Sequence, residues 1–292
     1  MMTAPLTKSA DHLVPGVSPQ LYGEADFERI AKVLRIEAGI VLDERKRTLA
    51  YSRVAPLVRN QGLTTFSEFL DQIENQPELA TKMIAALTTN HTYFNREPHH
   101  FEHLVSQVRP ALMNQAERGE TVRIWSAGCS SGEEIWTVLM YLLGEDLMAG
   151  KKFARGPLVA LASDLAEHAV KAAEEATYPT EAVSVMPPEL HANWCAKDGD
   201  RTKIGPDLHR LVRFRQLNLL GQWPFKQQFD LIFCRNVMIY FDGPTKERLV
   251  ERLAHQVRPG GYIYIGHSER MSGPALELLE LVGPTVYRRR MP

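Results

Sequence analysis

The stretch of this 292-residue sequence with the clearest chemical potential is the loop GCSSGEE, residues 128–134. It follows the β-rich run VRIWSA at 122–127 and opens an apolar helical pattern. Gly128 and Gly132 have no Cβ and would let the backbone approach a ligand closely. The dinucleotide pattern G-x-G-x-x-G is absent, and acids at a helix start repel a pyrophosphate. The loop therefore favours a cationic or neutral ligand over NAD.

Asp164 ends the next β-rich run, PLVALASD, at 157–164. A carboxylate at this place can accept hydrogen bonds from both ribose hydroxyls of a nucleoside. It can equally act as the N-cap of the following helix. The glycine loop upstream favours the nucleoside interpretation.

The histidines give a weaker signal. His99 and His103 are four residues apart and share a helix face, but the spacing supplies no third ligand, so we expect no metal. A solvated helix start after Pro98 is the preferred interpretation. His267 follows a predicted strand and either lines the substrate entrance or makes a structural hydrogen bond. Cys129 is interpreted as a space-filling residue.

The whole chain of 292 residues has the length of about two domains. The 34 basic and 35 acidic side chains nearly balance, which argues against a nucleic-acid partner or a membrane-surface protein. The three cysteines are too few for a disulfide framework or a structural zinc site. No apolar run is long enough to span a bilayer and no signal peptide is apparent, so we expect a soluble, cytoplasmic protein.

The organisation along the chain predicts two different modules. Residues 1–20 are expected to be a flexible tail, and residues 21–90 an N-terminal helical domain of about four helices, followed by a helix over 98–117. From residue 122 strands alternate with helices, which implies a mainly parallel sheet covered on both faces. Residues 285–288 are expected to form its edge strand. Residues 177–211 interrupt the alternation as an irregular insertion.

Several strings resemble one known family, the CheR chemotaxis receptor methyltransferases. They are NHTYFNRE (90–97), SAGCSSGEE (126–134), LASD (161–164), FDLIFCRNVMIYFD (229–242) and GGYIYIGHSE (260–269). The resemblance runs from about residue 24 to the end. It implies an α/β fold: a Rossmann-like class I methyltransferase sheet over residues 91–292, an N-terminal all-helical domain, and a small β-subdomain insertion at about 177–211. It also implies a protein-glutamate O-methyltransferase that converts S-adenosylmethionine (SAM) into S-adenosylhomocysteine.

The resemblance carries site residues over position by position. Arg96 and Tyr240 are expected beside the transferable methyl group, as the catalytic pair. The expected cofactor contacts are Asn90, Thr92, Arg96, Gly128, Glu133, Asp164, Asn218, Leu219, Arg235 and Asn236. Glu133 suits the methionine ammonium or a nearby donor.

The chemistry itself asks little of the protein. A glutamate with a pKa of about 4.3 is ionised at neutral pH, so its carboxylate can attack the methyl carbon without a general base. Opposite charges on the two reactants disappear in the reaction, so burial and alignment lower the barrier. This agrees with a sequence that shows no Ser-His-Asp or Cys-His constellation.

The expected partner is the cytoplasmic helical domain of chemoreceptors, whose methylated region is acidic. The second predicted helix is basic, and Arg45, Lys46, Arg53 and Arg59 are the candidate docking residues. A solvated charged face is the alternative interpretation. Because the segment 196–202 is short, we expect weak or no binding of a receptor's C-terminal pentapeptide tether. Two other functions remain open: a methyltransferase for another protein or a small-molecule carboxylate, and a non-catalytic SAM-binding signalling module.

Overall fold

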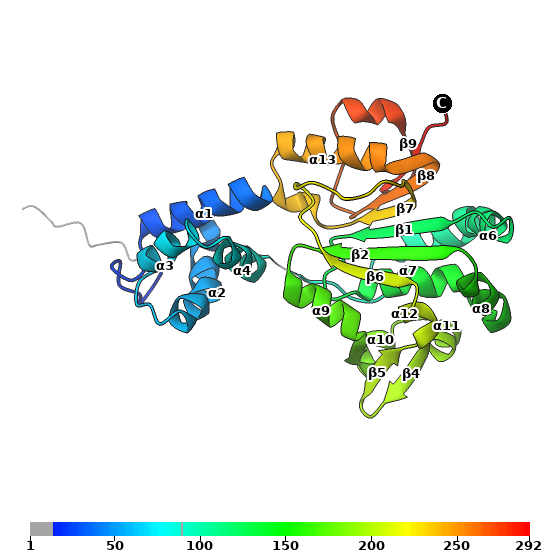
Figure 1. The fold of residues 1–292 in the computed structure, drawn as a ribbon, viewed down its shortest axis with the longest axis horizontal. Coiled ribbons are helices and arrows are strands. Elements are labelled where there is room, and N and C mark those ends of the chain that lie inside the picture. Colours follow the sequence, from blue (N-terminus) through cyan, green and yellow to red (C-terminus); the bar gives the residue numbers. More distant parts are fainter. Residues whose placement is uncertain (1–13, 89) are drawn as a thin grey trace, which may run out of the picture. The chain divides into compact units, whose positions relative to one another are not determined.

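The structure, a computed structural model, describes residues 14–88 and 90–292. The chain divides into two compact units, residues 1–89 and 90–292 (Figure 1). Of the predicted tail, residues 1–13 lie outside the described residues, whereas residues 14–20 form turns in which Val14 is buried. Within the described residues, every helix is too short or too polar to cross a bilayer.

The first unit is helical, as its apolar spacing predicts. It consists of α1 (Glu24–Ala38), the 3₁₀ turn η1 (Glu44–Lys46), α2 (Arg47–Asn60), α3 (Phe66–Ile73) and α4 (Pro77–Leu87). Thr65 and Glu68 form a capping box that starts α3, and Gly39 adopts φ 67° to end α1. Helix α1 packs on α3 and α2 packs on α4, and the apolar stripes of these helices are buried between them.

The second unit begins with a nearly continuous helical stretch. It contains α5 (His99–His103), a π-helical turn η2 (Leu104–Val108) and α6 (Arg109–Glu117). The wide turn immediately precedes Arg109 and Pro110, and proline lacks the amide hydrogen that an uninterrupted α-helix needs. The helix predicted over 98–117 is therefore present, with a change of pitch inside it.

A seven-stranded mixed sheet forms the centre of this unit (Figure 1). Its strands are β1 (Val122–Ala127), β2 (Leu158–Asp164), β6 (Val212–Gln216), β7 (Phe229–Cys234), β8 (Val257–Ile265), β9 (Leu279–Gly283) and β10 (Val286–Arg289). The spatial order is β6-β2-β1-β7-β8-β10-β9, with the first five strands parallel and β10 antiparallel to both neighbours. The connecting helices are α7 (Glu133–Leu143), α8 (Leu147–Arg155), α9 (Glu167–Glu175) and α13 (Gly243–Gln256).

Alternate residues of the central strands enter two different cores. Ile124, Leu231 and Phe233 belong to the apolar cluster that includes α7, whereas Trp125 and Ile232 belong to the cluster that includes α13. Successive side chains of a strand point to opposite faces, so the sheet is buried on both faces. This confirms the sheet predicted from the apolar runs.

One local prediction was wrong. The strand expected at the edge over 285–288 is β10, which lies inside the sheet, while β9 forms the edge. Strand β8 begins at Val257, so the segment Pro259-Gly260-Gly261 lies within it. The register of β7 against β8 shifts between Phe229 and Leu231, which accommodates these glycines.

The insertion at 177–211 is ordered and contains the small β-sheet that the family resemblance implies, whereas its residues alone predicted an irregular segment. It comprises β3 (Thr177–Pro179), α10 (Thr180–Val183), α11 (Pro188–Trp194), β4 (Cys195–Asp198), β5 (Arg201–Ile204) and α12 (Pro206–His209). The strands form a separate antiparallel sheet in the order β3-β5-β4. The Tyr178 hydroxyl in β3 donates to the Ser131 carbonyl (2.6 Å) and accepts from Trp136 Nε1 (2.9 Å). The insertion is thereby attached to the glycine loop.

Asp230 stabilises the opposite end of β7 from that loop. It is 2% exposed and accepts from the Arg123 amide (2.7 Å) and from Gln115 Nε2 (3.0 Å), and it forms an ion pair with Arg258. We predict that Asp230→Asn lowers the free energy of unfolding by about 1–3 kcal/mol, because an amide cannot accept from all these donors. Urea unfolding measures the change.

Glu280→Gln is the control, because the ion pair of Glu280 with Arg288 is about two-fifths exposed and solvent screens it, so it contributes little to stability. Equal losses for the two variants would contradict a special role for Asp230.

Candidate functional site

Ser130 joins three segments at the carboxyl ends of β1 and β2. Its amide donates to Asp164 Oδ2 (2.8 Å), and its hydroxyl donates to the Asn90 carbonyl (2.8 Å). Asp164 Oδ1 accepts from the Ala166 amide (2.9 Å), while Ala166 itself is the N-cap of α9. Asp164 is therefore not the helix cap; the amides of Ser130, Ala166 and Leu165 bind it, which leaves one of its four acceptor positions for a further donor. Burial raises the pKa of this carboxyl group.

The two loop glycines are needed for packing between segments of the protein. A Cβ on Gly128 would lie 2.5 Å from Val237 Cγ2, and one on Gly132 would lie 2.8 Å from Ala173 Cβ. Both residues also have positive φ, 91° and 97°. The close approach that the sequence attributes to a ligand is thus made by Val237 after β7 and by Ala173 of α9.

The adjacent glutamates at the start of α7 differ in their partners. Glu134 is buried, accepts from the Ser126 hydroxyl (2.7 Å) and forms an ion pair with Arg235 Nη1 (3.3 Å). Glu133 is half-buried and accepts from the Ser131 hydroxyl (2.7 Å). Among the described residues, no basic side chain forms an ion pair with Glu133, and burial raises its pKa. Of the two glutamates, Glu133 is thus the one whose charge no Arg or Lys compensates in the part of the chain that the structure describes.

Arg235 lies at the end of β7 with its side chain 2% exposed. One Nη group pairs with Glu134, and the other pairs with Glu97 Oε2 (3.2 Å) and donates to the Arg96 carbonyl. Both Nη groups of its guanidinium are engaged inside the protein, whereas its buried Nε has no hydrogen-bond partner among the described residues. The side chain holds the segment that carries Arg96.

The segment around Arg96 has a constrained backbone. Asn95 and Glu97 adopt φ 57° and 61°, a conformation that costs free energy in residues other than glycine and that is common at functional sites. The Asn95 amide donates to Thr137 Oγ1 (3.2 Å), which attaches the segment to α7. The Arg96 side chain donates to the His91 carbonyl (2.9 Å) and its guanidinium lies 5.6 Å from the centre of the Tyr93 ring.

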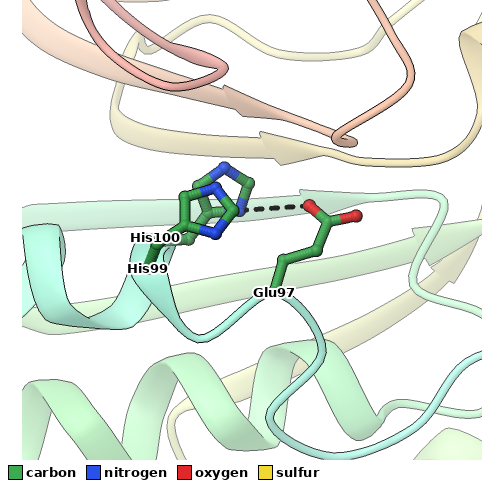
Figure 2. Close-up of side chains that lie close together, drawn as sticks. All are labelled: Glu97, His99 and His100. Carbon is green, nitrogen blue, oxygen red and sulfur yellow. Dashed lines mark ion pairs between the residues drawn. The ribbon is translucent and has the colours of Figure 1, made fainter.

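Glu97, His99 and His100 come together beside this segment (Figure 2). The prediction that no acid accompanies the histidines was wrong, because the left-handed φ of Glu97 turns its carboxylate back towards α5. His100 is fully buried and contacts Glu97 Oε2 (Nδ1, 3.5 Å) and Thr285 Oγ1 (Nε2, 2.8 Å), so the helix start is not solvated as expected. Arg235 already supplies a positive charge to the same Glu97 oxygen. We therefore interpret this cluster as part of an ion-pair network.

His267 belongs to the same network. Its amide and its Nδ1 contact Glu97 Oε1 at 3.2 and 2.8 Å, which is the structural alternative considered for this histidine. Neither Glu97 nor Glu134 was predicted as a site residue. Both occur in the strings that carried the resemblance, but only the fold shows that they share Arg235.

The remaining predicted cofactor residues follow β6 and β7. Asn218 Oδ1 accepts from the Leu220 amide (2.9 Å), and Leu219 is buried. Asn236 has φ 60°, and its amide donates to Glu269 Oε2 (2.9 Å). Tyr240 ends the 3₁₀ turn η3 (Met238–Tyr240) and is half-buried, as is Thr92. All these residues lie in the second unit, whose first residue is Asn90.

The candidate docking residues lie in the first unit and differ in their exposure, and Arg45 forms an ion pair with Asp43. Arg45 and Lys46 are in η1 and Arg59 is near the end of α2, and all three are exposed. Arg53 Nη1 instead donates to the carbonyls of Ala86 (3.2 Å) and Thr88 (2.6 Å). Arg53 therefore closes the C-terminus of α4, so its charge is less available to a partner.

Comparisons with known proteins identify the class. Residues 90–287 match "CheR methyltransferase, SAM binding domain", and residues 25–88 match "CheR methyltransferase, all-alpha domain". A probable chemotaxis protein methyltransferase of Rhizobium etli is 40% identical over 86% of this chain and 95% of its own. The chemotaxis protein methyltransferase of Borreliella burgdorferi is 34% identical over 90% of this chain and 94% of its own. Chemotaxis protein methyltransferase 2 of Pseudomonas aeruginosa is 36% identical over 91% of this chain and 93% of its own.

The fold and the site thus define a SAM-dependent methyltransferase, and SAM is its cofactor. The chain belongs to the CheR methyltransferase family, and its relatives act in chemotaxis. The predicted fold class, a Rossmann-like class I methyltransferase sheet with an all-helical N-terminal domain, is confirmed.

The buried network makes stability depend on pH. Burial and the nearby Arg235 hold the pKa of His100 well below its usual 6.5. Burial alone would raise the pKa of Glu97, but the charge of Arg235 and the hydrogen bonds from His267 outweigh it, so this pKa lies below 4.5. As the pH falls through 6.5, His100 gains a proton in the unfolded chain but not in the folded one. Below 4.5 Glu97 does the same, so both groups make acid destabilising.

We predict that His100→Gln flattens the fall in the free energy of unfolding between pH 6.5 and 5. A single such group contributes a slope of up to about 1.4 kcal/mol per pH unit. Urea titrations at a series of pH values measure the slope. His255→Gln is the control, since His255 is exposed and the substitution should leave the slope unchanged. An unaltered slope in His100→Gln would show that another group governs this pH range.

Proposed function

We propose that this protein transfers a methyl group from SAM to glutamate side chains of chemoreceptors, giving glutamyl methyl esters and S-adenosylhomocysteine. One observation carries the proposal most directly. Ser130 and Arg235 connect the segment 90–97 to the ends of β1, β2 and β7, which supports a single site that includes Asn90, Arg96 and Asp164. The chemotaxis methyltransferase relatives support the choice of substrate.

The donors in the site suit the cofactor. Among the described residues the buried Asn90 Nδ2 group has no hydrogen-bond partner, and the Asp164 carboxylate can accept a further bond. Asn90, Asp164 and Asn218 would hold polar groups of the nucleoside, and Glu133 would hold the ammonium group. SAM supplies the methyl group on a positively charged sulfur. The identity of each contact is part of the proposal.

The protein's task in this reaction is positioning and exclusion of water. The substrate carboxylate is ionised at neutral pH and needs no general base. The carboxylates of Glu97 and Glu134 pair with Arg235 within the protein, which lowers their repulsion of an incoming carboxylate. We assign to Arg96 and Tyr240 the orientation of the substrate carboxylate and of the methyl-bearing end.

For substrate recognition we propose that the exposed basic residues Arg45, Lys46 and Arg59 steer the acidic cytoplasmic helices of chemoreceptors. A charge on a solvent-exposed rim acts mainly on the association rate and is screened by salt. Within the described part of the chain strand β4 pairs with β5 alone, which leaves one edge for strand addition, but the connection of β4 to β5 contains only residues 199 and 200. We keep the prediction of weak or no tether-peptide binding, which calorimetry with the peptide tests, and we place the reaction in the cytoplasm.

Arg96→Ala should reduce kcat/KM for receptor methylation by roughly 100-fold or more, because one positioned cationic donor is lost. The fold should survive, since the side chain contacts only the His91 carbonyl and the Tyr93 ring in the described contacts. The assay is base-labile incorporation of labelled methyl into receptor-containing membranes.

Arg118→Ala is the matched control, because Arg118 is mainly exposed and pairs with Glu120. Activity of Arg96→Ala within a factor of two or three of the control would remove Arg96 from the catalytic pair.

Arg59→Glu should lower kcat/KM for receptor methylation by about tenfold at low salt, with most of the loss disappearing at about 1 M salt. Arg155→Glu makes the same change of charge at an exposed position of α8 and should have little effect. The measurement is the methylation rate of the three proteins across a salt series. Equal rates for the two variants at low salt would argue against steering by this face.

A further inference from the structure

Glu269 is a buried carboxylate that none of the roles described so far employs. It lies in the segment GHSE (266–269) after β8 and is 3% exposed. Its Oε2 accepts from the amides of Asn236 (2.9 Å) and Gly266 (2.6 Å), and its Oε1 accepts from the amide of Ile239 (3.2 Å). Among the described residues, no basic side chain forms an ion pair with it, so backbone amides hold its charge.

These amides belong to the ends of two neighbouring strands. Strands β7 and β8 are parallel, with Cys234 opposite Ile265, so the segments that follow them leave the sheet side by side. A Cβ on Gly266 would lie 2.4 Å from Asn236 Nδ2 and 2.8 Å from its amide nitrogen. The two segments therefore touch at a glycine, and the Glu269 carboxylate joins them.

The segment that Glu269 holds is the one that carries Asn236 and Tyr240. Asn236 adopts φ 60°, which is unfavourable for a residue with a side chain unless the surroundings impose it. Two of the amides that Glu269 binds, those of Asn236 and Ile239, lie on either side of Val237 and Met238, just before Tyr240. Their separation fixes the course of the chain between the end of β7 and Tyr240.

We propose that Glu269 is a positioning residue that sets the 236–240 segment for methyl transfer. The inference rests on the proposed function for the roles of Asn236 and Tyr240. A carboxylate is suited to this task because it accepts hydrogen bonds at every lone pair. A glutamine of the same shape carries an NH₂ group that faces amide hydrogens, so at least one amide loses its acceptor and the segment shifts. A displacement of about 1 Å at a reacting group costs roughly 100-fold in rate.

Glu269→Gln tests the proposal, with Asp230→Asn as the matched control. Asp230 is also a buried carboxylate that accepts from a backbone amide, and it lies at the other end of β7. Three quantities are compared: exchange of the amide hydrogens of Asn236 and Ile239, affinity for S-adenosylhomocysteine by calorimetry, and kcat and KM for receptor methylation. The first is measured without cofactor.

We expect the two amides to exchange about tenfold faster in Glu269→Gln. We also expect weaker S-adenosylhomocysteine binding and a kcat lowered by roughly 10- to 100-fold, with KM for the receptor nearly unchanged. Asp230→Asn should leave all three as in the wild type, even at equal loss of stability. Unchanged exchange at the two amides, or kinetic losses no larger than in the control, would overturn the proposal.

Gly266→Ala provides a second variant if Glu269→Gln does not fold. The added methyl group pushes Asn236 away, and the same pattern of exchange, binding and kcat is expected, whereas wild-type behaviour would overturn the proposal. Failure of the proposed function gives a different result. In that case the wild-type protein binds S-adenosylhomocysteine without methylating receptors, while exchange and cofactor affinity still decide the role of Glu269.

Discussion

The buried Arg235 guanidinium, shared by Glu97 and Glu134, is the interaction on which the site depends. It joins the end of β7 to the start of α7 and to the 90–97 segment, and it also binds the Arg96 carbonyl. Removing one member of such a group leaves an uncompensated buried charge, which typically costs about 3–5 kcal/mol. The network therefore fixes the main chain of Arg96 before any ligand arrives.

The carboxylates of the site differ in the groups that compensate their charge. Glu97 and Glu134 take the charge of Arg235, whereas Asp164 and Glu269 are held by backbone amides. Glu133 has a hydroxyl partner, Ser131, which leaves its charge for a cation. This division reconciles several acids with the proposed reaction, in which the substrate is itself a carboxylate, because most of the negative charge is already compensated within the protein.

Residues with an unfavourable backbone conformation are also concentrated in the candidate site. Asn95, Glu97, Ser130 and Asn236 all have positive φ, and all lie in the candidate site. Each is held by contacts from another element, such as Thr137 with Asn95 and Glu269 with Asn236. The surrounding fold over-determines these conformations, as is required for strained residues to persist. The site is consequently built from loops, but from loops whose positions are fixed by the sheet and by α7.

The sequence by itself determined the alternation of strands and helices and the helical first unit. It also favoured a cationic or neutral ligand over NAD at the loop between β1 and α7. Apolar periodicity and turn residues are local properties, so they identify β7 and α9 from their own residues. The quoted strings also identified the family, because they combine several uncommon residues at fixed spacing.

Only the tertiary structure decided which groups meet. Glu97, Glu134 and Arg235 are far apart in the chain, and no local pattern announces their pairing. Strand β9 lies at the edge because β10 pairs antiparallel with β8 and so lies between β8 and β9. This order depends on contacts between the strands and not on the composition of β9 or β10. Likewise Gly128 and Gly132 are required by Val237 and Ala173, neighbours brought close by folding. Long-range contacts carry this information because pairing and burial are properties of the folded chain as a whole.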